Sequence, residues 1–135
     1  MKFMLILKSS KDSEAGKMPS EESIAATVKY NQEQAKAGIL VDAAGLYPSS
    51  KGARVRFSAG GKKTVIDGPF AESKELVAGY WLIQVKSLEE AIEWAKRAPI
   101  ADNETIEVRR FFEMSDFPED VHKVVEGIEK KHERH

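Results

Sequence analysis

The side chains best suited to acid–base chemistry in this chain gather around one short turn. Segment 67–70 reads Asp-Gly-Pro-Phe, and Glu72 and Lys74 follow it closely. A carboxylate can transfer a proton in catalysis when its neighbours raise its pKa, and a lysine can orient an anionic substrate. We therefore take Asp67, Glu72 and Lys74 as catalytic candidates, with Tyr80 on the next predicted strand as a fourth.

The same turn also has a purely structural interpretation. An Asp can hydrogen-bond to the backbone that follows it, Gly adopts positive φ and Pro fixes φ, so segment 67–70 is typical of a tight turn. The neighbouring charges would then form a solvated loop with local ion pairs. In the functional alternative the cluster projects into a cleft near Tyr80 or Trp81, and in a third version Asp42 supplies the partner carboxylate.

Composition narrows the chemistry further. The chain of 135 residues has no cysteine, and its three histidines, His122, His132 and His135, all lie in the last fourteen residues. Residues 1–121 therefore cannot hold a Ser-His-Asp triad, a two-histidine zinc site or a thiolate site. We predict that the protein uses no metal and no cofactor.

The charge distribution indicates which classes of binding partner to expect. The chain has 21 basic and 22 acidic residues, and the acidic excess is confined to residues 113–135. Neither part has the basic character of a nucleic-acid-binding domain. The apolar run at 3–7 is shorter than a signal-peptide core, and no run approaches the roughly 20 residues that cross a bilayer. We expect a cytoplasmic protein that binds neither nucleic acid directly nor membranes.

Hydrophobic patterning predicts an α+β fold. Residues 9–18 are polar and aperiodic, which indicates an exposed loop. The order β-α-β, hairpin, β-α-β predicts a ferredoxin-like sandwich, in which helices cover one face of an antiparallel sheet. The predicted strands are 3–7, 39–46, 53–57, 63–66, 79–85 and 104–112, and the predicted helices are 20–37 and 87–98, with a third that starts at 116.

The first predicted helix has two interpretations. Its apolar stripe, Ile24, Val28 and Ala35, is weak for a core helix. The helix could pack on the sheet through its alanines and turn its polar side chains to water. Alternatively, its polar side chains border a pocket between helix and sheet. The candidate ligand-binding residues are then Thr27, Tyr30, Asn31, Asp42 and Trp81.

A second copy of the chain is the predicted partner. Aromatic and aliphatic residues of the last two strands, such as Trp81, Ile83 and Phe111, offer more apolar area than one helical layer covers, so we expect a homodimer through the open sheet face. We divide the chain into a domain at 1–112 and a helical extension at 113–135. The extension should rest on a spare sheet face or on the other subunit through Val121, Val124, Val125 and Ile128.

Three segments carry a family resemblance. They read VIDGPFAESKE at 65–75, GYWLI at 79–83 and AIEWA at 91–95. Together they closely resemble the YCII-related family, in its DGPF-domain branch, and the likeness runs from Met1 to about Arg109. The resemblance implies a dimeric α+β barrel, which agrees with the fold expected from the element order.

The resemblance says less about activity. The wider YCII group looks like small enzymes with a proposed His-Asp dyad whose histidine lies on the first helix, but helix 20–37 contains no histidine. We therefore expect either a weak acid–base or lyase-type enzyme that acts on a small polar organic molecule, or a ligand-binding or regulatory module without catalysis. DGPF proteins are often associated with transcription initiation, and the charge pattern here does not support direct DNA contact.

Overall fold

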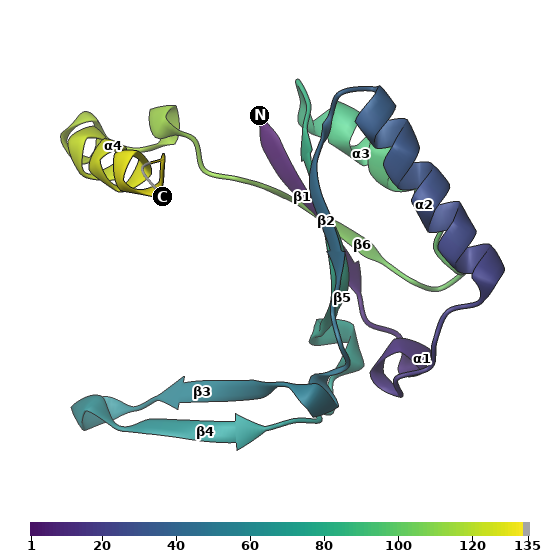
Figure 1. The fold of residues 1–135 in the computed structure, drawn as a ribbon. Helices are drawn as coiled ribbons and strands as arrows, with labels where there is room; N and C mark the ends of the chain where they lie inside the picture. Colours follow the sequence, from purple (N-terminus) through teal and green to yellow (C-terminus); the bar gives the residue numbers. More distant parts are fainter. Residues whose placement is uncertain (134–135) are drawn as a thin grey trace.

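The chain folds into an antiparallel sheet with helices on one face, as Figure 1 shows edge-on. The computed structural model describes residues 1–133, apart from the side chains of residues 73, 125 and 128–133. Its elements are β1 (Lys2–Lys8), α1 (Lys11–Glu14), α2 (Glu21–Lys36), β2 (Leu40–Gly45), β3 (Ala53–Phe57), β4 (Lys63–Asp67), β5 (Val77–Gln84), α3 (Leu88–Lys96), β6 (Ile106–Arg110) and α4 (Glu119–Glu133).

The sheet has the strand order β2-β5-β1-β6, and β3 and β4 form a separate two-stranded hairpin. All neighbouring strands are antiparallel, with Leu5 of β1 opposite Trp81 of β5 and opposite Val108 of β6. This is the topology of a ferredoxin-like α+β sandwich, with the hairpin inserted between its two halves. The predicted fold is correct at this level.

Local signals start α2 and α3, and end α2, where the sequence indicates, whereas the helix expected to start at 116 starts at Glu119. The Ser20 hydroxyl accepts a hydrogen bond from the Ser23 amide at the start of α2, and the Ser87 hydroxyl accepts one from the Glu90 amide at the start of α3. Such caps satisfy amides that have no partner within the helix. Gly38 follows α2 with a φ of 75°, which suits glycine.

The prediction of a loop at 9–18 is wrong in part, because these residues contain the short helix α1. The Ser10 hydroxyl accepts from the Ser13 amide, and the Ser13 hydroxyl accepts from the Ser10 amide. This reciprocal pair is a capping box, which stabilises the start of a helix by filling two amides at once. The aperiodic polar sequence concealed it, since a four-residue helix has no room for an apolar stripe.

The core lies between the sheet and the helices α2 and α3. Its members come from alternate positions of β1 and β5, with contributions from α2 and α3: Phe3, Leu5, Tyr30, Trp81, Ile83, Ala91 and Trp94. Trp81 and Ile83 therefore point toward the helices and not toward the open face. Our expectation that these two side chains offer apolar area beyond what the helices cover is wrong, because side chains alternate along a strand and these two lie on the covered face.

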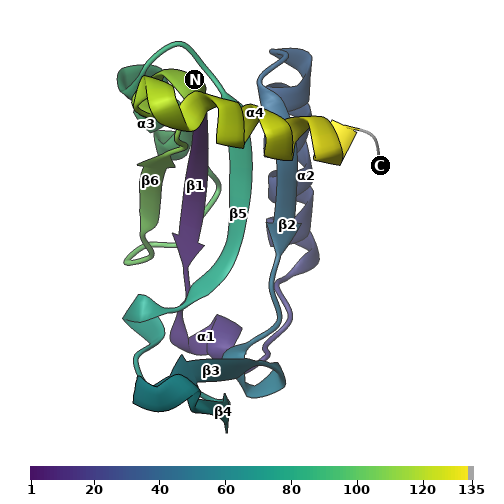
Figure 2. The same ribbon diagram turned by 90° about the vertical axis from the view of Figure 1, so that its left-hand side faces the viewer.

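Two arms extend from the open side of the sheet, at its opposite ends (Figures 1 and 2). We call residues 51–67 the hairpin arm and residues 113–133 the C-terminal arm. Arg110 lies 3.3 Å from the Asp116 carboxylate, which also accepts from the Glu113 amide, and these contacts fix the base of the C-terminal arm. Among residues 1–133 no helix combines the length and apolar character that a membrane crossing requires.

Candidate functional site

A cavity of about 680 Å³ lies between the N-terminal half of α2 and the covered face of the sheet. Its floor is apolar and comes from the sheet, with Leu7, Ala43 and Trp81. α1 and the segment up to Pro19 enclose one end, and residues 99–101 with Glu104 add a further side. The wall from α2 is polar and consists of Ser20, Ser23, Thr27 and Asn31.

The orientation of α2 creates this polar wall. Thr27 and Asn31 are half-buried against the sheet, whereas Ile24 and Val28 are 46% and 48% exposed. The apolar stripe expected to face the core thus faces outward. The interpretation in which the polar side chains of this helix turn to water is wrong for Thr27 and Asn31.

One hydrogen bond fixes the geometry of the polar wall. The Trp81 indole Nε1–H donates to the Asn31 side-chain oxygen at 2.7 Å. Because an indole nitrogen can only donate, the amide of Asn31 must turn its oxygen toward Trp81. Its Nδ2 group keeps two N–H donors that bond to nothing else within the described residues. The hydroxyl of Thr27 donates to the Ser23 carbonyl oxygen, and among the described residues no group donates to its lone pairs.

Tyr30 and Gln34 support the site from deeper in the core. Tyr30 is 3% exposed, and its hydroxyl donates to the Trp94 carbonyl oxygen at 2.5 Å. Burial raises the pKa of Tyr30. Its ring packs edge-on against Trp81, with the two centroids 5.2 Å apart, so it positions the floor of the cavity rather than lining it. Gln34 is fully buried, and its amide has no partner in the described part of the chain.

Ionisable groups of both signs border the cavity. The positive groups are Lys8 and Lys17, and the negative groups are Asp12 and Glu104. The Lys17 ammonium lies 3.9 Å from the Asp12 carboxylate. The cavity therefore has balanced charge. Within the residues whose side chains are described, no three acidic or histidine side chains gather closely enough to bind a metal ion together.

Asp42 and Tyr80 form a second, separate pair. The Tyr80 hydroxyl donates to the Asp42 carboxylate at 2.9 Å, and this hydrogen bond, with the negative charge of Asp42, raises the pKa of Tyr80. Tyr80 lies opposite Ile6 and next to Trp81 on β5, so its side chain is on the open face. The residue reaches the edge of the cavity, but its hydroxyl belongs to the other side of the sheet.

The three charged candidates of the DGPF segment lie in a third place. Asp67 ends β4, and the side chains of Asp67, Glu72 and Lys74 are exposed and outside the cavity lining. The structure therefore brings together Thr27, Asn31 and Trp81, pairs Asp42 with Tyr80 elsewhere, and leaves the DGPF charges apart from both. Sequence reasoning missed the cavity-lining residues of 8–20, because the serine pairs Ser10–Ser13 and Ser20–Ser23 mark helix starts and do not indicate a cavity.

Comparison with known proteins gives a family, one relative by sequence and one similar solved structure. A model of the YCII-related domain matches residues 1–115. A protein of Rhizobium meliloti (strain 1021), described as the uncharacterized protein R00369, is 46% identical over 61 residues. That alignment spans 45% of this chain and 48% of the relative, so it covers about half of its length.

A similar solved structure is the 5-chloro-2-hydroxyhydroquinone dehydrochlorinase (TftG) of Burkholderia phenoliruptrix AC1100, in complex with 2,5-dihydroxybenzoquinone. It is 12% identical in sequence and superposes with a TM-score of 0.47. The match covers 87% of this chain and 100% of that one.

Proposed function

The chain belongs to the YCII-related domain family, and we propose that it binds a small organic molecule of low net charge in the cavity between α2 and the sheet. The volume of about 680 Å³ lies within the range of roughly 300–1,000 Å³ that is usual for small-molecule sites. An apolar floor with a few polar groups on one wall is also the usual composition of such a site.

One observation carries this proposal, namely that α2 faces the sheet with its polar side. Hydrophobic burial does not explain this in the N-terminal half of the helix, since burying Ile24 and Val28 there would gain about 25 cal/mol for each Å² removed from water. Half-buried polar side chains cost free energy unless they find partners. A bound molecule with hydrogen-bonding groups would provide those partners for Asn31 and Thr27.

The polar wall also indicates the kind of ligand. The Asn31 Nδ2–H groups donate, so they require an acceptor such as a carbonyl, ether or hydroxyl oxygen. The free lone pairs of Thr27 accept from a hydroxyl or amine. Trp81 and Ala43 offer an apolar floor, and the balanced charges of the rim favour no strongly charged ligand. A compact hydroxylated or carbonyl-bearing molecule satisfies all three conditions.

Thermal shift measurements with small hydroxylated and carbonyl-bearing compounds test the proposal. A ligand at one hundred times its Kd stabilises the folded state by about 2.7 kcal/mol, which is readily seen as a higher Tm. We expect such a shift in the native chain, a loss of about tenfold in affinity in Asn31→Ala, and no loss in Gln32→Ala, which removes an exposed amide from the same helix. Equal binding by the two variants would contradict the assignment of the cavity.

A catalytic version of the proposal uses the same cavity. We propose that any acid–base or lyase-type chemistry depends on Glu104 and Lys8, because these ionisable groups line the cavity in which a substrate would bind. Asp67 lies outside the cavity of its own chain. Once a substrate is known, Glu104→Gln should lower kcat while Asp67→Asn preserves it, and the reverse result would move catalysis to the DGPF turn.

We also propose that the chain forms a homodimer across the open face of the sheet. The hairpin arm carries five basic residues and no acidic one between Lys51 and Ile66, whereas the C-terminal arm carries seven acidic against three basic residues. Both arms extend from the open side (Figure 1). A two-fold arrangement that sets the hairpin arm of one copy against the C-terminal arm of the other pairs opposite charges, and the alternative that pairs identical arms opposes like charges.

A further inference from the structure

Few contacts within α1 itself hold the end wall of the cavity in place. α1 has four residues, none of them buried, yet Ser10, Asp12 and Ser13 of this segment line the cavity. An isolated helix of this length is unstable in water, because its few hydrogen bonds do not offset the conformational entropy lost when the first turn forms. The position of this wall must therefore depend on contacts with other parts of the chain.

Glu14, the last residue of α1, makes the contact that links it to a distant segment. One oxygen of the Glu14 carboxylate accepts from the Ser49 amide at 2.9 Å, and the other accepts from the Ser49 hydroxyl at 2.5 Å. Ser49 begins the short 3-10 turn Ser49–Lys51, which leads from β2 into the hairpin arm. Hydrogen bonds to a charged group are among the stronger ones in proteins.

The DGPF turn packs on the other side of Ser49. Since the Ser49 hydroxyl gives its proton to Glu14, its oxygen is free to accept, and it accepts from the Phe70 amide at 3.0 Å. A Cβ on Gly68 would lie 1.7 Å from the Ser49 carbonyl oxygen, so only glycine allows this approach. The Arg54 guanidinium lies 3.8 Å from the centre of the Phe70 ring and holds the turn from the hairpin side.

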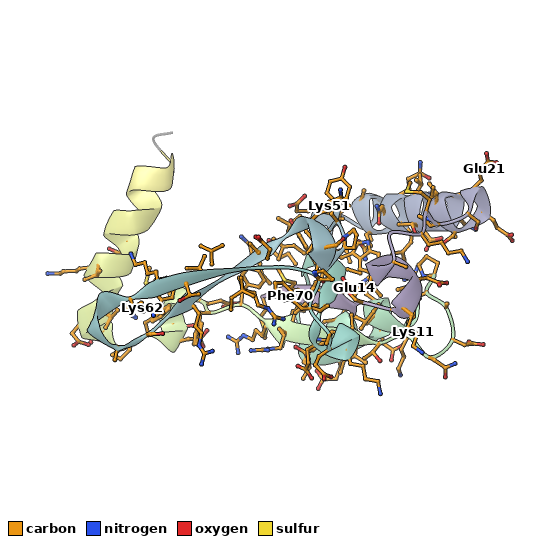
Figure 3. All side chains as sticks on the ribbon, turned by 90° about the horizontal axis from the view of Figure 1, so that it is seen from below. Lys11, Glu14, Glu21, Lys51, Lys62 and Phe70 are labelled. Atoms are coloured by element: carbon orange, nitrogen blue, oxygen red, sulfur yellow. The ribbon has the colours of Figure 1, made fainter. Side chains whose placement is uncertain are left out.

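We propose that the DGPF turn positions the end wall of the ligand cavity through Ser49 and Glu14. In Figure 3, Glu14 and Phe70 lie close together, because both of them bond to Ser49. Glu14, Ser49 and Gly68 act here as positioning residues: none of them lines the cavity, and each acts through its neighbour. The consequence for ligand affinity rests on the proposed function, while the positioning of α1 does not.

Amide hydrogen exchange tests the positioning directly. We expect Glu14→Ala to increase exchange at least tenfold at the amides of residues 14 and 15, which donate to the carbonyl oxygens of Ser10 and Lys11, and to leave Leu5 in the sheet unchanged. Lys11→Ala is the matched control, because Lys11 is exposed on the same helix and does not line the cavity. Ser49→Ala should increase exchange in α1 and at the Phe70 amide together.

Acrylamide quenching of tryptophan fluorescence tests the link to the cavity without a known ligand. Trp81 lines the cavity and Trp94 does not, so a Trp94→Phe background reports on Trp81 alone. We expect Glu14→Ala to raise the quenching constant about twofold in this background, and Glu14→Gln, which keeps an acceptor for the Ser49 amide, to recover most of the protection.

Together with the thermal shift panel, the two measurements show which step of the proposal fails. If Glu14→Ala and Lys11→Ala exchange alike in α1, the positioning role of Glu14 is overturned. If α1 exchanges faster but quenching of Trp81 is unchanged, α1 does not control access to the cavity, and the proposal is overturned at that step. A chain that passes both tests and binds no compound in the thermal shift panel contradicts the proposed function and leaves the positioning by the DGPF turn intact.

Discussion

The two faces of the sheet are built from the same strands and differ in almost every other property. The covered face holds Phe3, Leu5, Trp81 and Ile83, which are at most 6% exposed, and the one polar-walled cavity described above. The open face carries side chains of mixed kind: half-buried Met4, Ile6 and Leu82, the Asp42–Tyr80 hydrogen bond, and an ion pair between Glu107 and Arg109.

The difference teaches that adjacent residues of one strand serve separate purposes. Tyr80 and Trp81 are neighbours in sequence, yet Trp81 bonds to Asn31 at the cavity and Tyr80 bonds to Asp42 on the other side. A candidate site that combines them would require both faces at once. The covered face is complete within one chain except for the cavity, whereas the open face has apolar and charged groups that a second copy could bury.

The largest expected effect comes from truncating the covered face. Ile83→Ala should lower the free energy of unfolding by about 3–4 kcal/mol, because Ile83 is fully buried. Leu82→Ala, its neighbour on the open face, should cost about 1 kcal/mol in the monomer and in addition weaken self-association. Chemical denaturation with sedimentation analysis measures both quantities. Equal costs for the two variants would show that the faces do not differ as described.

The contrast also explains how far the sequence predicts this molecule. Strand alternation and the caps at Ser20 and Ser87 are local signals, and they predicted the fold, since a ferredoxin-like sandwich follows from their order. The orientation of α2 is not local. It depends on which side of the helix meets the sheet, and the apolar stripe of Ile24 and Val28 indicated the wrong side.

The candidate site was harder to predict, because its parts meet only through tertiary contacts. The sequence offers Thr27, Asn31 and Trp81 on a helix face and a strand far apart in the chain, and in the structure they line one cavity. Nothing in segment 9–18 shows that its serines form a wall, because Glu14 reaches Ser49 across 35 residues of sequence. A cluster of charges such as that around Asp67 is visible in sequence, but its distance from a cavity is not.

A smaller loss of stability is expected at the junction between the cavity and the hairpin arm. Gly68→Ala places a methyl group against the Ser49 carbonyl oxygen, and the required shift should cost about 2–3 kcal/mol. Gly52→Ala is the matched control, because a Cβ there would lie 3.6 Å from the same oxygen, an ordinary contact. Thermal unfolding of the two variants checks this, and similar Tm values would mean that the turn moves away freely.

The proposed pairing of arms predicts a dimer that weakens with salt. Arg56→Glu combined with Lys62→Glu should reduce dimer affinity about tenfold, since each lost exposed pair is worth about 0.5–1 kcal/mol. Glu119→Lys with Glu126→Lys on the C-terminal arm should restore it in the same chain. Sedimentation equilibrium at low and high salt measures the affinity. The loss followed by restoration is the decisive result, because in a dimer in which identical arms face each other each pair of changes would reduce like-charge repulsion, and the first pair would strengthen the dimer.

The smallest expected effect is the pH dependence of stability that comes from the Asp42–Tyr80 pair. Its direction follows from the raised pKa of Tyr80. The hydrogen bond to Asp42 raises the pKa of Tyr80 above the ordinary value of 10.0, so the folded chain holds this proton more tightly than the unfolded chain does. Its contribution to stability is therefore complete below pH 10 and is lost as the pH rises through the folded pKa. Asp42→Asn should return the Tyr80 pKa toward 10, as followed by NMR of the tyrosine ring.

Glu107→Gln is the control for this titration, because it neutralises a carboxylate on the same face that pairs with Arg109 instead of Tyr80. It should leave the Tyr80 pKa unchanged. The titration also bears on the comparison of the two faces. Association across the open face would bury the pair and raise the pKa of Tyr80 further, because burial disfavours the charged phenolate. The Tyr80 pKa should therefore fall on dilution below the dimer Kd, and a value independent of concentration would place the open face in water in every form of the protein.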